Sequence, residues 1–192
     1  MPFMSVIDET AQSIGAVNTV VRGPMGWHGY NTDAAGLTAA LLDFLQVDNI
    51  AGRKVAILGA GGASRAVAYA IYKQGAQACI FNKTLEKAQA LAAKYGFQAA
   101  SLSEESLPLL QEYADIIIQA TSVGLKASSP ADDPIPFYQF KGSEALYDLV
   151  YVPEVTPVMQ RAQAAGCRVH SGMSMLIEQA KEQRRLYARF SF

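Results

Sequence analysis

A glycine-rich run follows a short apolar segment and precedes a sequence that favours a helix. The apolar segment spans residues 54–58, and the run consists of Gly59, Ala60, Gly61, Gly62 and Ala63. In a strand–turn–helix unit, the first glycine allows a sharp turn, the second lets a pyrophosphate approach the backbone, and the helix start supplies N–H donors. The run therefore predicts a dinucleotide-binding turn. Because Ser64 stands where the strict pattern has Gly or Ala, a tightly packed turn without a ligand is the alternative interpretation.

The residues after the next expected strand indicate which dinucleotide binds. An NAD-binding protein has Asp or Glu there, which accepts a hydrogen bond from the ribose 2′-hydroxyl. This chain instead has Asn82, Lys83 and Thr84, with Lys87 one helical turn later. Amide, ammonium and hydroxyl groups offer donors and positive charge to a 2′-phosphate, which a carboxylate would repel. We therefore expect NADP, and the alternative is that Lys83 and Lys87 are only the solvated start of a helix.

Short β-rich runs alternate with longer helical runs from Arg53 onward, which is typical of a parallel sheet covered by helices. The six expected strands are 54–58, 78–81, 97–100, 115–119, 145–149 and 168–170. The helices expected between them are 63–74, 85–95, 103–111 and 156–165. Right-handed crossovers then predict a doubly wound, six-stranded α/β Rossmann sheet with the strand order 3-2-1-4-5-6.

Two segments do not fit this α/β repeat: a hairpin with the helix after it, and the last helix. Residues 16–21 and 27–30 are expected to form a hairpin, and a helix is expected over 33–45. The last helix is expected to run from 173 to about 188. Residues 127–136 contain three prolines and two serines, so they predict a surface loop after the fourth strand.

The overall composition excludes several classes of protein. Hydrophobic residues make up 51% of the 192 residues, charged residues 17%, and the net charge is −1. These values predict a globular protein that binds neither nucleic acid nor membranes. No basic segment followed by an apolar one opens the chain, so a cytoplasmic protein is expected. Cys79 and Cys167 are expected as separate reduced thiols on distant strands, and neither metal-ligand spacing nor a nucleophile elbow is present.

Several motifs together resemble the shikimate dehydrogenase family, and the similarity runs from about Asp8 to the last helix. The motifs cover residues 14–19 (IGAVNT), 29–33 (GYNTD), 82–84 (NKT), 120–124 (ATSVG), 147–153 (YDLVYVP) and 171–180 (SGMSMLIEQA). The resemblance implies a reversible, NADP-dependent reduction of 3-dehydroshikimate to shikimate, in the biosynthesis of chorismate and aromatic amino acids.

The resemblance also implies roles for individual residues. Asn18, Asp33, Tyr151 and Gln179 correspond to substrate ligands, and Asp33 to half of a catalytic Lys-Asp dyad. The cofactor-binding positions implied beyond those named above are Thr121, Ser122, Val123, Leu149, Gly172 and Met175. Amide and carboxylate groups suit a polyhydroxylated ring, and hydride transfer to a ketone needs a proton donor for the developing alkoxide.

Each of these residues also has a purely structural interpretation. Asn18 and Asn31 could be turn residues of the hairpin, and Asp33 is well placed to be the N-cap of the helix that follows it. Gln179 could be a surface amide, and Tyr151 could pack in the core. His28 and His170 match no catalytic position of the family, and both are expected to be structural or surface residues.

The chain departs from the family at its N-terminal end. Family members carry, before this region, two serines that bind the substrate carboxylate and the lysine of the dyad, and neither feature is among these residues. The alignment that fits best puts residues 2–4 in the helix after the lysine. We therefore expect four parts: 1–32 as the remnant of a substrate domain, 33–50 as a linker helix, 51–172 as the Rossmann domain, and 173–192 as a helix returning to the substrate domain.

This departure leaves two classes of function open. The first is a shikimate dehydrogenase represented mainly by its cofactor domain, with an N-terminal substrate domain acting in trans or with a homo-oligomer, and inactive by itself. A quinate-using relative is an alternative within this class, although quinate use tends to go with an NAD-favouring carboxylate. The second class is a catalytically inactive module that binds NADP.

Overall fold

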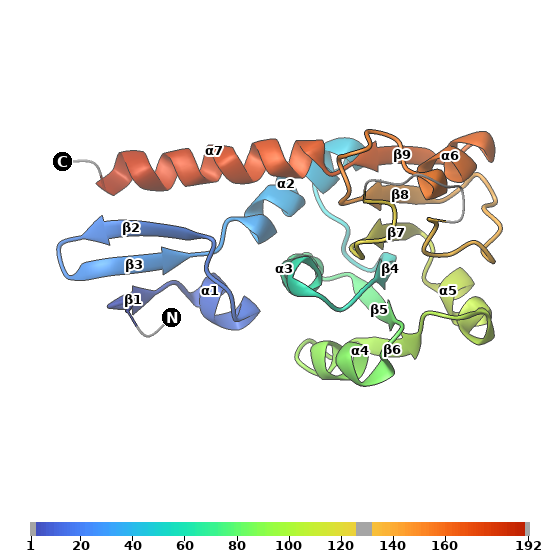
Figure 1. Cartoon of the computed structure of the whole chain (residues 1–192), viewed down its shortest axis with the longest axis horizontal. Helices are drawn as coiled ribbons and strands as arrows, with labels where there is room; N and C mark the ends of the chain where they lie inside the picture. Colours follow the sequence, from blue (N-terminus) through green and yellow to red (C-terminus); the bar gives the residue numbers. More distant parts are fainter. Residues whose placement is uncertain (1–2, 126–131, 191–192) are drawn as a thin grey trace.

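The computed structural model describes residues 3–125 and 132–190 of the chain. They form a larger lobe around a six-stranded sheet and a smaller lobe around a three-stranded one. Two helices, α2 (Asp33–Leu45) and α7 (Met173–Phe190), lie between the lobes, and α7 runs from the larger lobe along the smaller one (Figure 1). The cleft described below lies where these helices meet the larger sheet.

The larger sheet is entirely parallel, as predicted. Its strands are β4 (Lys54–Leu58), β5 (Gln77–Asn82), β6 (Gln98–Ser101), β7 (Ile116–Gln119), β8 (Ala145–Asp148) and β9 (Arg168–Ser171). The spatial order is β6-β5-β4-β7-β8-β9. If only the strands of this sheet are counted along the chain from β4, the same order reads 3-2-1-4-5-6. The order reverses direction between β4 and β7, and open α/β sheets bind ligands beyond the strand ends at such a point.

Helices cover both faces of this sheet because successive side chains of a strand point to opposite faces. The fully buried Ile57, Ile80 and Ile118 belong to one apolar core, and Leu58, Phe81 and Ile117 belong to the other. The helices α2, α3 (Gly62–Lys73) and α4 (Leu85–Ala92) pack on the first core. The second core packs against α5 (Leu107–Glu112) and α6 (Pro157–Ala164), and the short 3-10 helix η1 (Glu104–Ser106) precedes α5.

The smaller lobe contains the predicted hairpin and two elements that were not predicted. The hairpin is β2 (Thr19–Gly23) and β3 (Gly26–Tyr30), and the strand β1 (Val6–Ile7) pairs in parallel with β3. The helix α1 (Glu9–Ile14) follows β1. The expected helix at residues 2–4 is wrong for Phe3 and Met4, which precede both elements, while Pro2 lies outside the described residues. The helix begins later because the Asp8 side chain caps it, accepting from Thr10 N at 2.9 Å.

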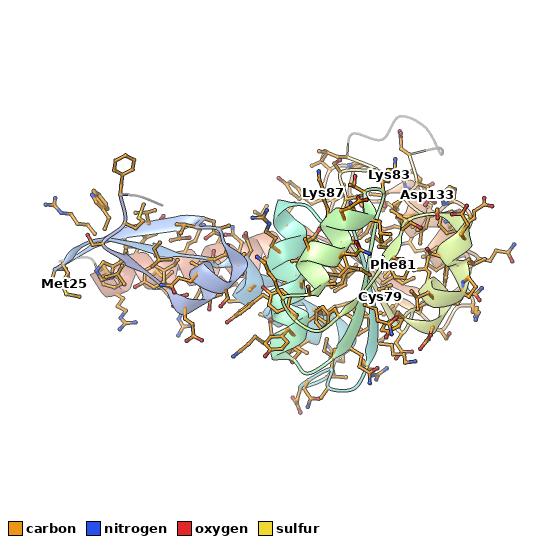
Figure 2. The ribbon with its side chains drawn as sticks, turned by 90° about the horizontal axis from the view of Figure 1, so that it is seen from below. Met25, Cys79, Phe81, Lys83, Lys87 and Asp133 are labelled. Atoms are coloured by element: carbon orange, nitrogen blue, oxygen red, sulfur yellow. The ribbon has the colours of Figure 1, made fainter. Side chains whose placement is uncertain are left out.

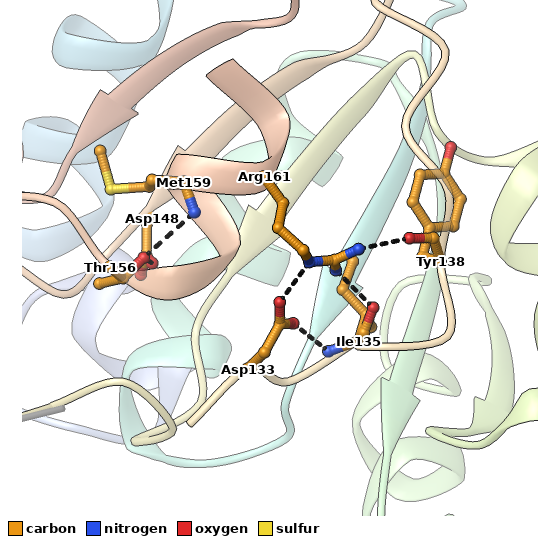
Figure 3. Close-up of polar contacts among 7 residues, drawn as sticks. All are labelled: Asp133, Ile135, Tyr138, Asp148, Thr156, Met159 and Arg161. Atoms are coloured by element: carbon orange, nitrogen blue, oxygen red, sulfur yellow. Dashed lines mark hydrogen bonds and ion pairs between the residues drawn. The ribbon is translucent and has the colours of Figure 1, made fainter. Parts of the chain in front are cut away.

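The segment predicted as a surface loop at 127–136 is partly buried. Its first part lies outside the described residues, but Asp133, Pro134 and Ile135 are buried. Arg161 of α6 holds this part: its Nε donates to Asp133 Oδ2 at 2.7 Å and its Nη2 to the Ile135 carbonyl at 2.8 Å (Figure 3). The prediction failed here because a distant arginine pairs the carboxylate and satisfies the backbone, so the segment packs against the sheet.

Three further findings concern the cysteines, possible metal ligands and possible membrane helices. Cys79 and Cys167 are both buried and form no disulfide. Among residues 3–125 and 132–190, no three His, Cys, Asp or Glu side chains are grouped so that they could hold a metal ion. Within the same ranges, no helix is both long and apolar enough to cross a membrane.

Candidate functional site

Four polar side chains from distant parts of the sequence meet in one hydrogen-bonded cluster. Asn18 precedes β2, Thr32 and Asp33 begin α2, and Gln179 lies on α7. Asn18 Nδ2 donates to Asp33 Oδ1 at 2.8 Å, and Thr32 Oγ1 donates to Gln179 Oε1 at 3.0 Å. The three residues singled out by the sequence, Asn18, Asp33 and Gln179, are therefore brought together, and Thr32 links them.

The cluster fixes the orientation of the Asn18 amide. Its Oδ1 accepts from Thr32 N at 3.0 Å and from Thr19 Oγ1 at 2.9 Å, so its Nδ2 faces Asp33. Thr19 and Thr32 are both fully or nearly fully buried, which keeps water away from this side of the amide. The amide is thus held from behind, with its donor side toward the carboxylate. Because the amide is already oriented, binding a ligand costs less conformational entropy.

Asp33 does not cap its helix. The N-cap is Thr32, and Asp33 is the first helical residue, so the N-cap interpretation of Asp33 is wrong. The backbone N–H of Asp33 donates instead to Asn31 Oδ1 at 3.0 Å. Burial raises the pKa of the Asp33 carboxyl above its ordinary value, and the hydrogen bond from Asn18 partly opposes this shift. The carboxyl is therefore bonded by Asn18 on one oxygen and is more basic than an exposed aspartate.

These side chains line a cleft of about 320 Å³ that reaches the start of α3. The lining residues are Asn18, Asp33, Ala63, Leu149, Tyr151, Gly172, Met175, Leu176, Gln179 and Gln183. Asn18, Asp33 and Gln179 give the cleft polar lining, Leu149, Gly172 and Met175 give it apolar lining, and Ala63 places it beside the glycine-rich turn. Tyr151 is 42% exposed, so its interpretation as a core residue is wrong.

A close approach at Gly172 shapes the apolar part of the cleft lining. A Cβ on this residue would overlap the carbonyl oxygen of Leu149. Gly172 N also donates to the Val150 carbonyl at 3.3 Å. Glycine is required at this position because only a residue without a side chain lets the start of α7 lie against the end of β8.

The glycine-rich turn is held by two side chains and is open on its outer side. Gly61 N donates to Ser64 Oγ at 3.1 Å, and Ala60 N donates to Asn82 Oδ1 at 3.1 Å. Ser64 is fully buried, so this departure from the strict glycine pattern stabilises the turn. Cβ atoms placed on Gly61 or Gly62 would meet nothing within 4 Å. The N-terminus of α3 therefore faces open space, as an anion-binding helix start requires.

Positive side chains gather beside this turn. Arg65, Lys87 and Lys94 line a groove that also includes Ala60, Gly61 and Gly62. Lys83 and Thr84 are exposed at the start of α4, and Figure 2 shows Lys83 and Lys87 at the same edge of the larger lobe. The Asn82 side chain is bonded within the protein. Its Nδ2 donates to the Thr84 carbonyl at 2.8 Å, so its amide connects the glycine-rich turn with the turn before α4. The sequence analysis did not single out Arg65 or Lys94, although Lys94 follows Lys87 at helical spacing.

The segment Thr121, Ser122 and Val123 lies beside the same turn because Gly59 approaches Ala120. A Cβ on Gly59 would lie 3.0 Å from the Ala120 carbonyl oxygen. The fully buried amide of Gln119 shapes this segment, accepting from Thr121 N at 2.6 Å and donating to the Val123 carbonyl at 2.8 Å. Of the three predicted positions, Thr121 thus lies directly at the first glycine of the turn, with its Cγ2 3.1 Å from that Cβ, and Ser122 and Val123 follow it along the chain.

Comparison with known proteins decides the family. A shikimate dehydrogenase (NADP(+)) from Ignicoccus hospitalis is 35% identical over 187 residues, covering 97% of this chain and 68% of the relative. The family model described as Shikimate / quinate 5-dehydrogenase matches residues 43–127. This chain belongs to the shikimate dehydrogenase family. Another relative of the same name, from Shouchella clausii, is 37% identical over 182 residues, or 92% of this chain and 64% of the relative.

Solved structures agree with this assignment. Shikimate dehydrogenase from Aquifex aeolicus superposes with a TM-score of 0.86 at 33% identity, covering 97% of this chain and 66% of that one. The Thermus thermophilus enzyme in complex with NADP(H) and shikimate gives a TM-score of 0.82 at 36% identity, with 95% and 66% covered. The chain therefore spans slightly less than two thirds of the length of several members of the shikimate dehydrogenase family.

Gly36 sets the position of Gln179 in this member of the shikimate dehydrogenase family. A Cβ on Gly36 would lie 2.7 Å from both the backbone N and the Cβ of Gln179, where α2 and α7 cross. We expect Gly36→Ala to push α7 outward, lengthen the bond between Thr32 and Gln179, and lower the free energy of unfolding by about 1–3 kcal/mol through overpacking. Denaturant unfolding measures this change.

The sign of the effect is the control for this prediction. At a helical site with room for a methyl group, Gly→Ala stabilises a helix by about 0.8–1.0 kcal/mol. A destabilising result at Gly36 can therefore come only from the contact with α7. An unchanged or increased free energy of unfolding would show that the two helices can separate without cost and that Gly36 does not set their spacing.

Proposed function

We propose that this chain serves the NADP-dependent, reversible reduction of 3-dehydroshikimate to shikimate. The observation that supports this most directly is the cleft in which Asn18, Asp33 and Gln179 meet beside the glycine-rich turn. The curated relatives carry the name shikimate dehydrogenase (NADP(+)). Because the chain spans only part of their length, we propose that it supplies the cofactor lobe and one wall of the substrate site.

In this proposal, the polar side chains of the cleft bind the hydroxyl groups of the substrate ring. Asn18 presents an amide donor that is oriented by Thr32, and Gln179 presents its amide from α7. Asp33 accepts from a ring hydroxyl and holds the proton that the substrate oxygen exchanges, together with the lysine of the family's dyad. The raised pKa of the Asp33 carboxyl favours this exchange, because a more basic carboxylate holds a proton more readily.

We propose NADP(H) as the cofactor, and the open turn fits this group. Its pyrophosphate would lie at Gly61, Gly62 and the start of α3, which have space and N–H donors. Lys83, Thr84 and Lys87, helped by Arg65, would hold the 2′-phosphate. Leu149, Gly172 and Met175 would line the nicotinamide pocket, beside Thr121, Ser122 and Val123. The bound cofactor supplies the hydride, and these residues orient it and exclude water.

The division of labour along the chain is part of the proposal. Residues 1–32 would belong to the substrate domain, 33–50 would link the domains, 51–172 would bind the cofactor, and 173–192 would return to the substrate domain. A domain with the serines and the lysine would complete the site, in trans or within a homo-oligomer. The expected setting is the cytoplasm.

Ligand binding by variants tests the substrate site. We expect Gln179→Ala and Asp33→Asn each to weaken shikimate binding in the presence of NADP+ by about tenfold or more. This is the effect of losing one hydrogen bond to a buried polar group. Isothermal titration calorimetry measures this affinity. Gln163→Ala, an exposed amide on α6, is the control and should leave the affinity unchanged. Equal shikimate affinities in all variants would remove Asp33 and Gln179 from the site.

A further inference from the structure

The loop between β8 and α6 carries two of the cleft residues but has little backbone support. It spans residues 149–155 and contains neither helix nor strand. Leu149 N donates to the Gln119 carbonyl at 2.8 Å, and the Val150 carbonyl accepts from Gly172 N, so both bonds lie at the start of the loop. Between described residues, no backbone hydrogen bond holds residues 151–155. Something else must therefore keep Tyr151 in the cleft.

The Asp148 carboxylate closes this loop at both ends. Its Oδ1 accepts from Val150 N at 2.9 Å, and its Oδ2 accepts from Thr156 Oγ1 at 2.7 Å. Thr156 Oγ1 also caps α6, accepting from Met159 N at 3.4 Å (Figure 3). Asp148 and Thr156 are both fully buried. One carboxylate thus connects the first residues of the loop with the N-terminus of the helix that ends it.

We propose that Asp148 is a positioning residue that, with Thr156, fixes the loop 149–155 and thereby holds Leu149 and Tyr151 in the cleft. A buried carboxylate is costly unless it is hydrogen-bonded. Both of its oxygens are bonded to the ends of this one loop, so loop closure is the role that its contacts specify. The apolar side chains of Val152 and Val155 are exposed, so they make few packing contacts that could fix the loop in place of these hydrogen bonds.

The pKa of Asp148 reflects its burial between the two ends of the loop and offers a pH-dependent test of that position. Burial raises the pKa of Asp148 to about 6, although the hydrogen bonds from Thr156 and Val150 lower it; the charge of Asp133, which is paired with Arg161, adds a smaller raising effect. The folded state therefore binds the Asp148 proton more tightly than the unfolded state does. This contribution to stability is complete below the unfolded pKa near 4 and is lost as the pH rises through about 6.

The direction of this pH dependence can be tested by measuring stability. We expect the denaturation midpoint of the wild type to be lower at pH 8 than at pH 5, and this difference to shrink in Asp148→Asn, because the amide does not titrate. The difference between wild type and variant isolates Asp148 from other groups. If both proteins changed equally with pH, the Asp148 carboxyl would titrate at its ordinary pKa, and its position as the buried carboxylate that closes the loop would be wrong.

Hydrogen exchange followed by mass spectrometry tests the loop itself. In Thr156→Val we expect the hydrogen-bonded amides of Leu149 and Val150, at the start of the loop, to exchange about tenfold faster, since a hydrogen bond to a charged group is lost and the loop opens more often. Thr156→Ser keeps the hydroxyl and should restore slow exchange. Tyr138→Phe is the matched control, because it also removes one hydroxyl bond to a buried carboxylate, Tyr138 Oη to Glu144 at 2.8 Å, at the other end of β8. Equal exchange in Thr156→Val and Tyr138→Phe would overturn the proposal.

A second experiment, a measurement of turnover, connects the loop to the proposed function. The role of Leu149 and Tyr151 in the cleft rests on that function. With a full-length relative's N-terminal domain added, Thr156→Val should lower kcat for shikimate while the affinity for NADP+ falls little, and Thr156→Ser should recover kcat. If the wild type itself turns over no shikimate under these conditions, the proposed function fails, yet the exchange result still decides the loop. Should Thr156→Val not fold, Asp148→Asn, which keeps the shape of the side chain, takes its place in both experiments.

Discussion

The 192-residue chain expressed by itself is expected to bind NADP(H) but to oxidise shikimate at least about 10²-fold more slowly than a longer relative. A general acid–base group typically contributes about 10²–10⁴-fold to the rate. The described residues that line the cleft include Asp33 but no lysine, and none of them is a serine. Hydride transfer is therefore provided for, whereas proton transfer and binding of the substrate carboxylate are not. Formation of NADPH from shikimate and NADP+ measures the rate.

Complementation is the control for this experiment. Adding the N-terminal domain of a longer relative should raise the rate, since that domain carries the lysine and the serines that the resemblance implies. The small lobe offers surface for it: Met25 is 73% exposed and Trp27 is 49% exposed at the hairpin. Asp33→Asn should abolish the gain. Rapid turnover by the chain alone would show that another group in these residues replaces the lysine, and the interpretation of the site would be wrong.

The alternation of apolar and helical runs was sufficient to predict the larger lobe. The strand 54–58 was predicted to the residue because it is a short apolar run that ends at a glycine. The strand β1 was missed because Val6 and Ile7 are too few for any periodicity, and their pairing with β3 is a tertiary contact. Burial of Ile135 could not be predicted either, since it depends on Arg161, 26 residues further along the chain.

The meeting of the candidate site residues in one cleft was predicted to a similar extent, and for similar reasons, while their roles stay predictions. The motifs around Asn18, Asp33 and Gln179 were sufficient to single out these residues from the sequence. Thr32 was missed because nothing in its own sequence shows that Asn18 and Gln179 lie on either side of it. Asp148 was missed although it lies inside a recognised motif, because its function is to bond two ends of a loop that a linear sequence does not bring together. Residues that act through tertiary hydrogen bonds are the ones that such patterns do not reveal.

The largest change in cofactor binding is expected from Lys83→Asp, which should reverse a preference for NADP(H) over NAD(H). Lys83 is exposed at the end of β5, near Lys87, where the 2′-phosphate would lie (Figure 2). Losing a charge-assisted contact costs about 1.5–3 kcal/mol, or roughly 10- to 150-fold in affinity. The new carboxylate also repels the phosphate and can accept from the 2′-hydroxyl of NAD. Calorimetric affinities for both cofactors, measured at one salt concentration, give the ratio.

The matched control is Lys73→Asp, which changes the net charge equally. Lys73 ends α3, a helix of 12 residues, so it lies about 18 Å from the glycine-rich turn. At that distance an exposed charge is largely screened at physiological salt, and the preference for NADP(H) should persist in this variant. If the unmodified chain bound both cofactors equally, Lys83 and Lys87 would be only the solvated start of α4. If instead Lys83→Asp left an existing preference intact, the 2′-phosphate would have to lie against Arg65, Lys87 and Lys94 alone, deeper in the groove between α3 and α4.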